Sequence, residues 1–298
     1  MTEGWLRALR FPRYFYRPAR GYWFTSFLAQ LIESGEGCFN VTLDIGLTQS
    51  QVCRQGGYVR VGDVELPITD LKPTEPDRVV FFDVDRHELY EVVKHTESGF
   101  YKLKAVGLDV APTLEINGIH MHRIKDVDPI TDTLYKIRAL RPKRGGVVLD
   151  TCLGLGYTAI MAAKSGASLV VSFEIDPNVV YIAERNPWSR GLVDDRVKIY
   201  LGDVVEAVYE LPDEFFDRVI HDPPRFTSST GDLYSQEFYN QLFRVLKPGG
   251  VLFHYTGEPR ARGPPSILKG IKERLVRAGF VRVFFDRRAL GFTAVKPG

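Results

Sequence analysis

The second half of the chain alternates short apolar runs with helical stretches, and this alternation constrains the fold more than any other feature. Helical patterns cover 157–164 and a stretch through Ala183, and the apolar runs stand at 147–150, 169–174, 197–200, 218–221 and 251–254. Parallel strands buried on both faces appear as continuous apolar runs, and each pair needs a crossover that is usually a helix. Residues 127–298 are therefore predicted to form an α/β domain with a doubly wound, mainly parallel sheet.

Residues 38–126 show shorter, alternating runs separated by turn residues, which predicts a smaller β-rich domain. These runs stand at 41–45, 58–61, 79–82 and 114–116. The pair Asn117-Gly118 tolerates the positive φ of a type I′ turn, so we expect a hairpin that returns through 120–122. A short helix is expected over 132–140, just before the junction with the α/β domain.

Residues 1–37 form a basic, aromatic N-terminal arm. Its arginines recur so regularly that no apolar core of a signal peptide or membrane span can form, so we expect a cytoplasmic protein without membrane association. The net charge of +2 is nearly balanced, so a nucleic-acid contact must come from local clustering. Over residues 10–24 cations interleave with aromatics, as suits phosphate and base contacts; an arm packed on the protein or on a partner subunit is an equal alternative.

The three cysteines, Cys38, Cys53 and Cys152, are widely spaced and include no C-x-x-C pair. The sequence therefore predicts neither a disulfide framework nor a zinc site, which fits a reduced compartment. His120 and His122 would point to one face of a strand, but no Cys or carboxylate nearby completes a ligand set. No metal is expected.

A glycine turn follows the run 147–150, with the sequence Asp-Thr-Cys-Leu-Gly-Leu-Gly from Asp150 to Gly156. Glycines at such a turn let the backbone approach a ligand closely and leave N–H groups at the start of the next helix to bind it. The position between strand and helix indicates a nucleotide-like ligand, although a tight turn also needs glycine for its geometry alone.

Glu174 ends the next apolar run, 24 residues beyond Asp150. An acidic residue at this place can accept hydrogen bonds from both hydroxyl groups of a ribose. The alternative is a solvated loop carboxylate, and the spacing from the glycine turn favours the ribose.

These residues belong to an ordered set that resembles the motifs of class I S-adenosylmethionine methyltransferases. The set is Val-Leu-Asp-x-x-x-Gly-x-Gly, Phe-Glu-Ile-Asp-Pro, Gly202-Asp203 and Asp222-Pro223-Pro224, and the resemblance covers roughly residues 130–298. It implies S-adenosyl-L-methionine as the cofactor. The positions that it implies for cofactor binding are Asp150, Cys152, Gly154, Gly156, Tyr157, Thr158, Glu174, Ile175, Asp203, Val204 and Asp222.

Within this set the resemblance assigns a part of the cofactor to each position. Asp150 and the glycine turn would face the methionine end, Glu174 the ribose, Ile175 the adenine face and Asp203 the adenine amino group. Cys152 stands where the family usually has an earlier glycine.

The run His221-Asp-Pro-Pro-Arg-Phe226 ends the fourth apolar strand and is similar to the motif with which amino-methyltransferases hold an exocyclic amino group. The lone pair of such a nitrogen is delocalised, so two acceptors for its N–H groups are needed to turn it toward the methyl carbon. The Asp222 carboxylate and the Pro223 carbonyl can be those acceptors. The residues implied to act on the substrate are Asp222, Pro223, Pro224, Arg225 and Phe226.

Arg225 stands where an aromatic residue usually follows the two prolines. Either Phe226 stacks on the target base, or the Arg225 guanidinium does so while also meeting phosphate. The Asp-Pro-Pro-Arg motif resembles that of an archaeal family of predicted methyltransferases linked to cytidine N4 methylation of ribosomal RNA. This resemblance implies ribosomal RNA as the substrate.

Two other functions compete with RNA methylation. An aminopropyltransferase that makes polyamines has a small β domain ahead of the same fold and uses decarboxylated S-adenosylmethionine, but the arginine after the two prolines puts a cation where its cationic substrate would lie. A non-catalytic RNA-binding protein with a degenerate fold is opposed by the intact Asp150, Glu174, Asp203 and Asp222. The sequence leaves the oligomeric state open, a homodimer included.

Overall fold

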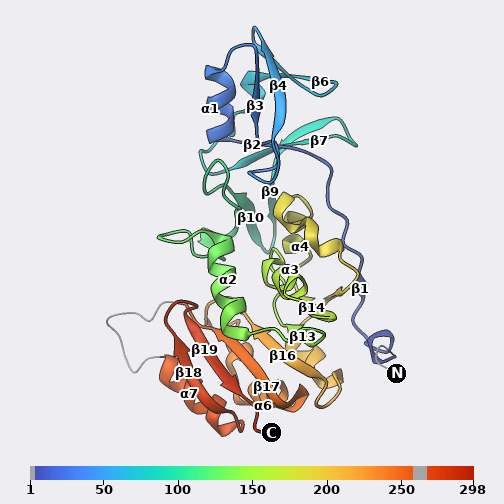
Figure 1. Ribbon diagram of the computed structural model, residues 1–298, viewed down its shortest axis with the longest axis vertical. Coiled ribbons are helices and arrows are strands. Elements are labelled where there is room, and N and C mark those ends of the chain that lie inside the picture. Colours follow the sequence, from blue (N-terminus) through green and yellow to red (C-terminus); the bar gives the residue numbers. More distant parts are fainter. Residues whose placement is uncertain (1–3, 258–266) are drawn as a thin grey trace. The chain divides into compact units, whose positions relative to one another are not determined.

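The computed structural model describes residues 4–257 and 267–298, so the first three residues of the predicted arm and residues 258–266 of the predicted α/β domain lie outside the described residues. The chain divides into two units (Figure 1). The first comprises Met1–Tyr16, Asp132–Pro177 and Leu192–Gly298, and the second comprises Arg17–Thr131 and Asn178–Gly191.

The first unit is built on an eight-stranded sheet with the strand order β1-β15-β14-β13-β16-β17-β19-β18. Its strands are β1 (Arg13–Tyr14), β13 (Val147–Asp150), β14 (Leu169–Glu174), β15 (Val197–Leu201), β16 (Phe216–His221), β17 (Leu246–Tyr255), β18 (Val281–Asp286) and β19 (Gly291–Val295). Strands β13 to β17 pair in parallel, whereas β1, β18 and β19 pair antiparallel with their neighbours. The predicted α/β fold with a mainly parallel sheet is confirmed.

Helices accompany the strands of this sheet, and α6 (Gln236–Val245) and α7 (Ile267–Arg277) pack on it. The other helices of this unit are α2 (Pro129–Leu140), α3 (Tyr157–Lys164) and α5 (Val204–Ala207), with 3-10 turns η1 (Trp5–Arg7), η4 (Val208–Glu210) and η5 (Gly231–Tyr234). By contrast, most of α4 (Pro177–Glu184) and most of the 3-10 helix η3 (Pro187–Val193) belong to the second unit. Ser235 caps the N-terminus of α6, because its hydroxyl accepts the Phe238 N–H. The apolar faces of α6 and α7 share one core with alternate residues of the strands, including Phe238, Leu242, Ile271, Leu275, Leu149, Val171, Val219 and Leu252.

The first part of the N-terminal arm packs on this unit. Strand β1 pairs with β15 at the edge of the sheet. The Phe11 ring lies edge-on to Phe173 with 6.3 Å between centroids, and Arg10 forms ion pairs with Glu206 and Glu210. Of the two alternatives for the arm, packing therefore describes residues 10–14.

The second unit contains three small antiparallel sheets, ordered β2-β7-β8, β3-β4-β5-β6 and β12-β11-β10-β9. Its elements are β2 (Gly21–Thr25), α1 (Ser26–Ser34), β3 (Cys38–Val41), β4 (Ser50–Gln55), β5 (Tyr58–Val61), β6 (Val64–Pro67), η2 (Ile68–Leu71), β7 (Val79–Asp83), β8 (Glu88–Glu91), β9 (Val93–Thr96), β10 (Gly99–Lys104), β11 (Thr113–Ile116) and β12 (Ile119–His120). One apolar core joins α1 to the first two sheets, through residues that include Phe24, Leu28, Ile32, Val52, Val59 and Val80.

Two local predictions for this unit have different outcomes. Asn117 and Gly118 both have positive φ, at 50° and 80°, and the hairpin between β11 and β12 forms as predicted. The strand predicted over 41–45 instead ends at Val41. The reason is Asp44, whose carboxylate accepts the N–H groups of Leu47 and Thr48 and so closes a turn that competes with a strand.

The prediction that the cysteines form no disulfide is wrong for two of them. Cys38 and Cys53 are bonded to each other, because the register of β3 against β4 places them directly opposite, with 4.0 Å between Cα atoms. Spacing along the chain gives no sign of such a cross-strand pair, and with a disulfide present the cysteines no longer indicate a reduced compartment. Cys152 carries a thiol. Within residues 4–257 and 267–298 no helix is long and apolar enough to cross a membrane.

Candidate active site

The glycine turn after β13 has the geometry that its sequence predicts. Gly154 and Gly156 have φ of +55° and +77°, in the left-handed region that glycine adopts without a steric penalty. A Cβ atom on Gly156 would also lie 2.6 Å from side-chain atoms of Leu192. Position 156 therefore requires glycine for two reasons: its backbone conformation is left-handed, and no room is left for a side chain. Helix α3 starts at the next residue, Tyr157, so its first N–H groups face the turn.

Asp150 ends β13 and is completely buried. Its carboxylate accepts hydrogen bonds from Ser172 Oγ at 2.7 Å and from Thr158 Oγ1 at 3.4 Å. Burial raises the pKa of Asp150 to about 8, and the carboxylates of Asp222 and Glu174 add to the rise. Burial and the neighbouring carboxylates thus outweigh the two hydrogen bonds that favour the ionised form of Asp150.

Glu174 ends β14 and links that strand to the glycine turn. Its Oε2 accepts the Gly154 N–H and its Oε1 accepts the Asp176 N–H, each at 3.0 Å. Burial raises the pKa of Glu174 to about 7, against the opposing effect of these backbone hydrogen bonds. Glu174 is therefore not the solvated loop carboxylate of the alternative interpretation.

The remaining positions implied for the cofactor differ in exposure. Ile175 is 65% exposed, whereas Val204 is buried in the core, so only its backbone is available to a ligand. Asp203 uses Oδ1 to cap α5 by accepting the Val205 N–H at 2.8 Å. The Gly202 N–H donates to the Glu174 carbonyl at 2.8 Å, which brings the end of β15 beside the end of β14. Burial raises the pKa of the Cys152 thiol, which is therefore neutral.

Asp222 lies directly after β16 and is held by a lysine that the sequence patterns did not single out. Lys136 Nζ lies 2.6 Å from Asp222 Oδ2 and 3.3 Å from Asp132 Oδ2, and the Lys136 side chain is only 1% exposed. The Nζ also lies 4.1 Å from the centroid of the Tyr255 ring. Burial lowers the pKa of Lys136, but the two carboxylates outweigh this effect and raise it above its ordinary value. Lys136 therefore stays a cation.

The predicted helix over 132–140 contained a signal for this arrangement. Asp132 and Lys136 are four residues apart, so they share one face of α2. A charged pair on a helix is usually a solvated one, and only the fold reveals that this pair is buried and reaches Asp222.

The residues that follow Asp222 turn outward. Phe226 is 53% exposed and lies edge-on to Tyr234, with 5.3 Å between ring centroids. The Tyr234 hydroxyl donates to the Pro224 carbonyl at 2.8 Å, and this bond fixes the start of the loop. Arg225 is exposed as well, so both candidates for stacking on a base are open to solvent.

His221 is buried and hydrogen-bonded on both ring nitrogens. Nδ1 lies 2.7 Å from Thr151 Oγ1, and Nε2 lies 2.9 Å from the Leu233 carbonyl. Burial lowers the pKa of His221 to about 3, so the ring is neutral and Nε2–H donates to Leu233. His221 ties the end of β16 to the glycine turn and to η5, so it is a positioning residue beside the motif.

The strand order and the mainly parallel sheet are those of the class I methyltransferase fold. Residues 136–274 match the TRM5/TYW2 methyltransferase domain. The crystal structure of spermidine synthase from Thermotoga maritima shares the fold, with a TM-score of 0.51 and 20% identity over 68% of this chain and 70% of that chain. The first unit is therefore an S-adenosylmethionine-dependent methyltransferase domain.

The chain belongs to the family of the uncharacterized protein MJ1233 of Methanocaldococcus jannaschii, with 48% identity over 238 residues, which are 79% of this chain and 80% of that protein. It is also similar to ribosomal RNA large subunit methyltransferase I of Photobacterium profundum, with 30% identity over 40% of this chain and 32% of that enzyme. Polyamine aminopropyltransferase of Thermoplasma volcanium is 31% identical over 48% of this chain and 51% of that enzyme. The chain thus matches about a third and about half of the length of these two enzymes.

The side chains around the glycine turn fit S-adenosylmethionine, which carries a sulfonium and an ammonium cation. Asp150 and Glu174 are buried carboxyl groups with raised pKa values, and a nearby cation or hydroxyl groups of a ligand would stabilise their ionised forms. Positive φ at Gly154 and Gly156 lets backbone N–H groups approach a ligand. The chemistry of these carboxyl and backbone N–H groups therefore agrees with the cofactor of the domain.

Proposed function

We propose that the protein transfers a methyl group to an exocyclic amino nitrogen of RNA, with cytidine N4 in ribosomal RNA as the target. The observation that carries this proposal is the ion pair between Lys136 Nζ and Asp222 Oδ2 at 2.6 Å. It engages one carboxylate oxygen of Asp222 and leaves Oδ1 to accept an N–H group from a substrate.

The reaction needs the amino group to be oriented more than it needs a strong base. The cofactor supplies an electrophilic methyl group when bound. Asp222 Oδ1 and the Pro223 carbonyl would hold the two N–H groups, so that the nitrogen lone pair points at the methyl carbon. Such positioning contributes roughly 7–11 kcal/mol to lowering a barrier. One N–H proton is released after transfer. The Asp222 carboxylate, which already accepts a hydrogen bond from this N–H group, is its first acceptor.

The same ion pair argues against a polyamine as the substrate. A polyamine is held by carboxylates that meet its ammonium groups, whereas here an ammonium of the protein already neutralises Asp222. A second cation at that place would be repelled by Lys136, which is buried and stays charged. A neutral amino group, as on a nucleobase, meets no such repulsion.

For the cofactor, we propose that Asp150 and the glycine turn hold the methionine end, Glu174 the ribose, and Ile175 and Asp203 the adenine. The exposed side chain of Ile175 and the raised pKa values of the two buried carboxyl groups support these assignments. For the substrate, exposed Arg225 and Phe226 next to Asp222 suit a base with its phosphate. We propose the cytoplasm as the compartment of the protein, because a ribosomal RNA substrate would be met there.

The test is to incubate the purified protein with methyl-labelled S-adenosylmethionine and unmodified ribosomal RNA, and then to digest the RNA to nucleosides. We expect label in N4-methylcytidine. Asp222→Ala should retain cofactor binding and lose at least about 100-fold in rate, the size of effect seen when one preorganised polar group is removed. Asp195→Ala, which removes an exposed aspartate elsewhere in the domain, is the matched control and should behave as wild type.

Other outcomes separate the competing functions. Full activity of Asp222→Ala would contradict the proposed role of this carboxylate. Label in protein alone would contradict an RNA substrate. Formation of aminopropylated amines from decarboxylated cofactor and a polyamine, with no methylated RNA, would favour the aminopropyltransferase.

A further inference from the structure

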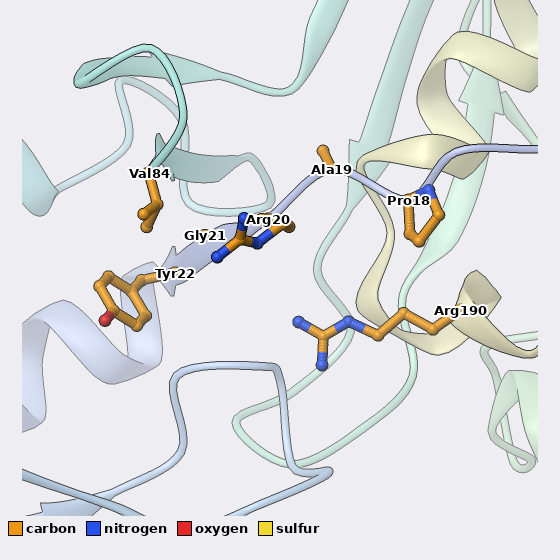
Figure 2. Close-up of a pocket in the computed structure, with 7 residues that line it drawn as sticks. All are labelled: Pro18, Ala19, Arg20, Gly21, Tyr22, Val84 and Arg190. Atoms are coloured by element: carbon orange, nitrogen blue, oxygen red, sulfur yellow. The ribbon is translucent and has the colours of Figure 1, made fainter.

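The second unit contains a cavity that the methyltransferase site does not use. Its volume is about 330 Å³, and it is lined by residues 18–22, Val84 and Arg190. Figure 2 shows the Arg20 and Arg190 guanidinium groups reaching toward the same space, with the Tyr22 ring at another side of it. A volume of this size lies at the small end of ligand pockets.

We propose that this cavity, formed by Arg20, Tyr22 and Arg190, is an RNA-binding site that takes a phosphate between the arginines and a base against the tyrosine. The proposal rests on the proposed function, because it assigns to the second unit a contact with the same RNA. Guanidinium groups bind phosphate through paired N–H donors, and aromatic rings offer a platform for bases of any sequence.

The walls of the cavity are held by hydrogen bonds within this unit. The Ala19 N–H donates to the Glu184 carbonyl at 2.8 Å, and the Val84 N–H donates to the Arg20 carbonyl at 3.0 Å. The indole N–H groups of Trp23 and Trp188 donate to the carbonyls of Arg185 and Ile45, at 2.6 and 2.8 Å. Segments far apart in the sequence are thereby fixed around one space, so a ligand would meet walls that are already in place.

The two arginines keep much of their capacity to bind an anion. Arg20 is 74% exposed, and its ion pair is a single contact of 3.3 Å with the exposed Asp85. Exposed surface pairs of this kind are weak, so an RNA phosphate can compete with it. Arg190 is 43% exposed and lies 3.7 Å from Asp44, too far for a strong hydrogen bond.

Asp44 is also already engaged by other donors. Its carboxylate accepts hydrogen bonds from the N–H groups of Leu47 and Thr48 and from the Thr48 hydroxyl. Arg190 is held over the Trp23 ring, with 5.0 Å from Cζ to the centroid, so its guanidinium is oriented before any ligand arrives.

The aromatic part of the cavity points to RNA over a small free anion. The Tyr22 ring is half-buried and stacks on Phe82, with 6.2 Å between centroids and 8° between planes. An anion alone needs no such ring. Arg17, which directly precedes the cavity-lining Pro18, is exposed as well and adds a cation beside the tyrosine, the combination that a single strand of RNA binds.

The experiment is a binding titration by fluorescence anisotropy, without cofactor, using a labelled single-stranded oligoribonucleotide of about 12 nucleotides, a length within the usual site sizes. The variants are Arg20→Ala/Arg190→Ala and Tyr22→Leu. The controls are Arg60→Ala, an exposed arginine of β5 outside the cavity, and Tyr22→Phe, which keeps the ring. Circular dichroism checks that each variant folds.

We expect the double arginine variant to bind at least about ten times more weakly, with a salt dependence reduced by about 0.7 per lost phosphate contact. Tyr22→Leu should weaken binding about 5- to 150-fold without changing the salt dependence, and both controls should match wild type. Wild-type affinity of the double variant would overturn the proposal. Absence of RNA binding by the wild type, or binding of inorganic phosphate alone, would overturn it as well.

Kinetics separate this proposal from the proposed function. The double arginine variant should raise the KM for RNA and leave kcat at saturating RNA unchanged, whereas Asp222→Ala should lower kcat and leave RNA affinity unchanged. If the double arginine variant methylates RNA with an unaltered KM, the proposal for the cavity is overturned and the proposed function is not. RNA binding that depends on the cavity in a protein that methylates no RNA would overturn the proposed function alone.

Discussion

Replacing Lys136 by methionine should both destabilise the fold and slow methyl transfer. Methionine keeps much of the volume and removes the charge, so Asp132 and Asp222 are left as carboxylates without their cation. Breaking a buried ion pair by removing one partner costs about 3–5 kcal/mol. We expect this loss in the free energy of unfolding at pH 8, measured by urea denaturation followed by circular dichroism.

The loss should depend on pH, and the sign follows from burial. Without Lys136, burial raises the pKa of Asp222 in the folded state further above its value in the unfolded chain, because the ammonium that lowers this pKa is gone. The folded state then binds a proton more tightly, so its stability falls as pH rises from about 4 toward the raised pKa, by about 1.4 kcal/mol per pH unit for this group. Lys136→Met should therefore be closer to wild type at pH 5.5 than at pH 8.

Three further variants separate charge from packing. Asp132→Asn added to Lys136→Met removes one of the two uncompensated carboxylates and should recover part of the stability. Lys136→Arg keeps the charge and should retain part of the activity. Lys164→Met, which removes an exposed lysine at the end of α3, should leave both quantities unchanged. A free energy of unfolding of Lys136→Met within about 0.5 kcal/mol of wild type, with the same pH dependence and the same kcat, would contradict the proposed role of the buried ion pair.

Two other predictions concern the cofactor site and the disulfide. The pKa values of Asp150 and Glu174 are about 8 and 7 in the cofactor-free protein. A cation near Asp150 and ribose hydroxyls that donate to Glu174 favour the ionised carboxylates, so cofactor binding releases protons and the affinity for S-adenosylmethionine should rise between pH 6 and 7.5. Calorimetry in two buffers of different ionisation enthalpy measures that release, and a constant affinity without it would contradict the assignment. Replacing Cys38 and Cys53 together by serine opens a cross-link that spans 15 residues and should lower the free energy of unfolding by about 3 kcal/mol in non-reducing buffer. Dithiothreitol should abolish that difference, and equal denaturation midpoints without it would count against the bond.

Much of the first unit could be predicted because its determinants are local. The apolar runs that became β13 to β17 are continuous, and each is followed within a few residues by a helical pattern or a turn. The glycine turn and the Asp-Pro-Pro motif are short segments whose backbone conformation is favoured by their own glycine and proline residues. Strand β1 escaped prediction because two residues at a sheet edge have no periodicity of their own.

Other features required the tertiary structure because they join residues that are distant in the sequence. Asp132 and Lys136 form an ordinary helical pair in the sequence, and their meeting with Asp222, 86 residues further on, depends on where α2 lies against the end of β16. The pairing of Cys38 with Cys53 depends on strand register, which no spacing rule specifies.

The cavity in the second unit also required the tertiary structure. One of its residues, Arg190, lies in the segment 178–191, which packs with the second unit although it follows β14 of the first unit in the sequence. The sequence by itself determined the class of fold and the positions of its motifs, through periods of two and 3.6 residues and through glycine and proline. Only the tertiary structure decided which charges are buried together, because burial and ion pairing depend on all the neighbours that the fold assembles.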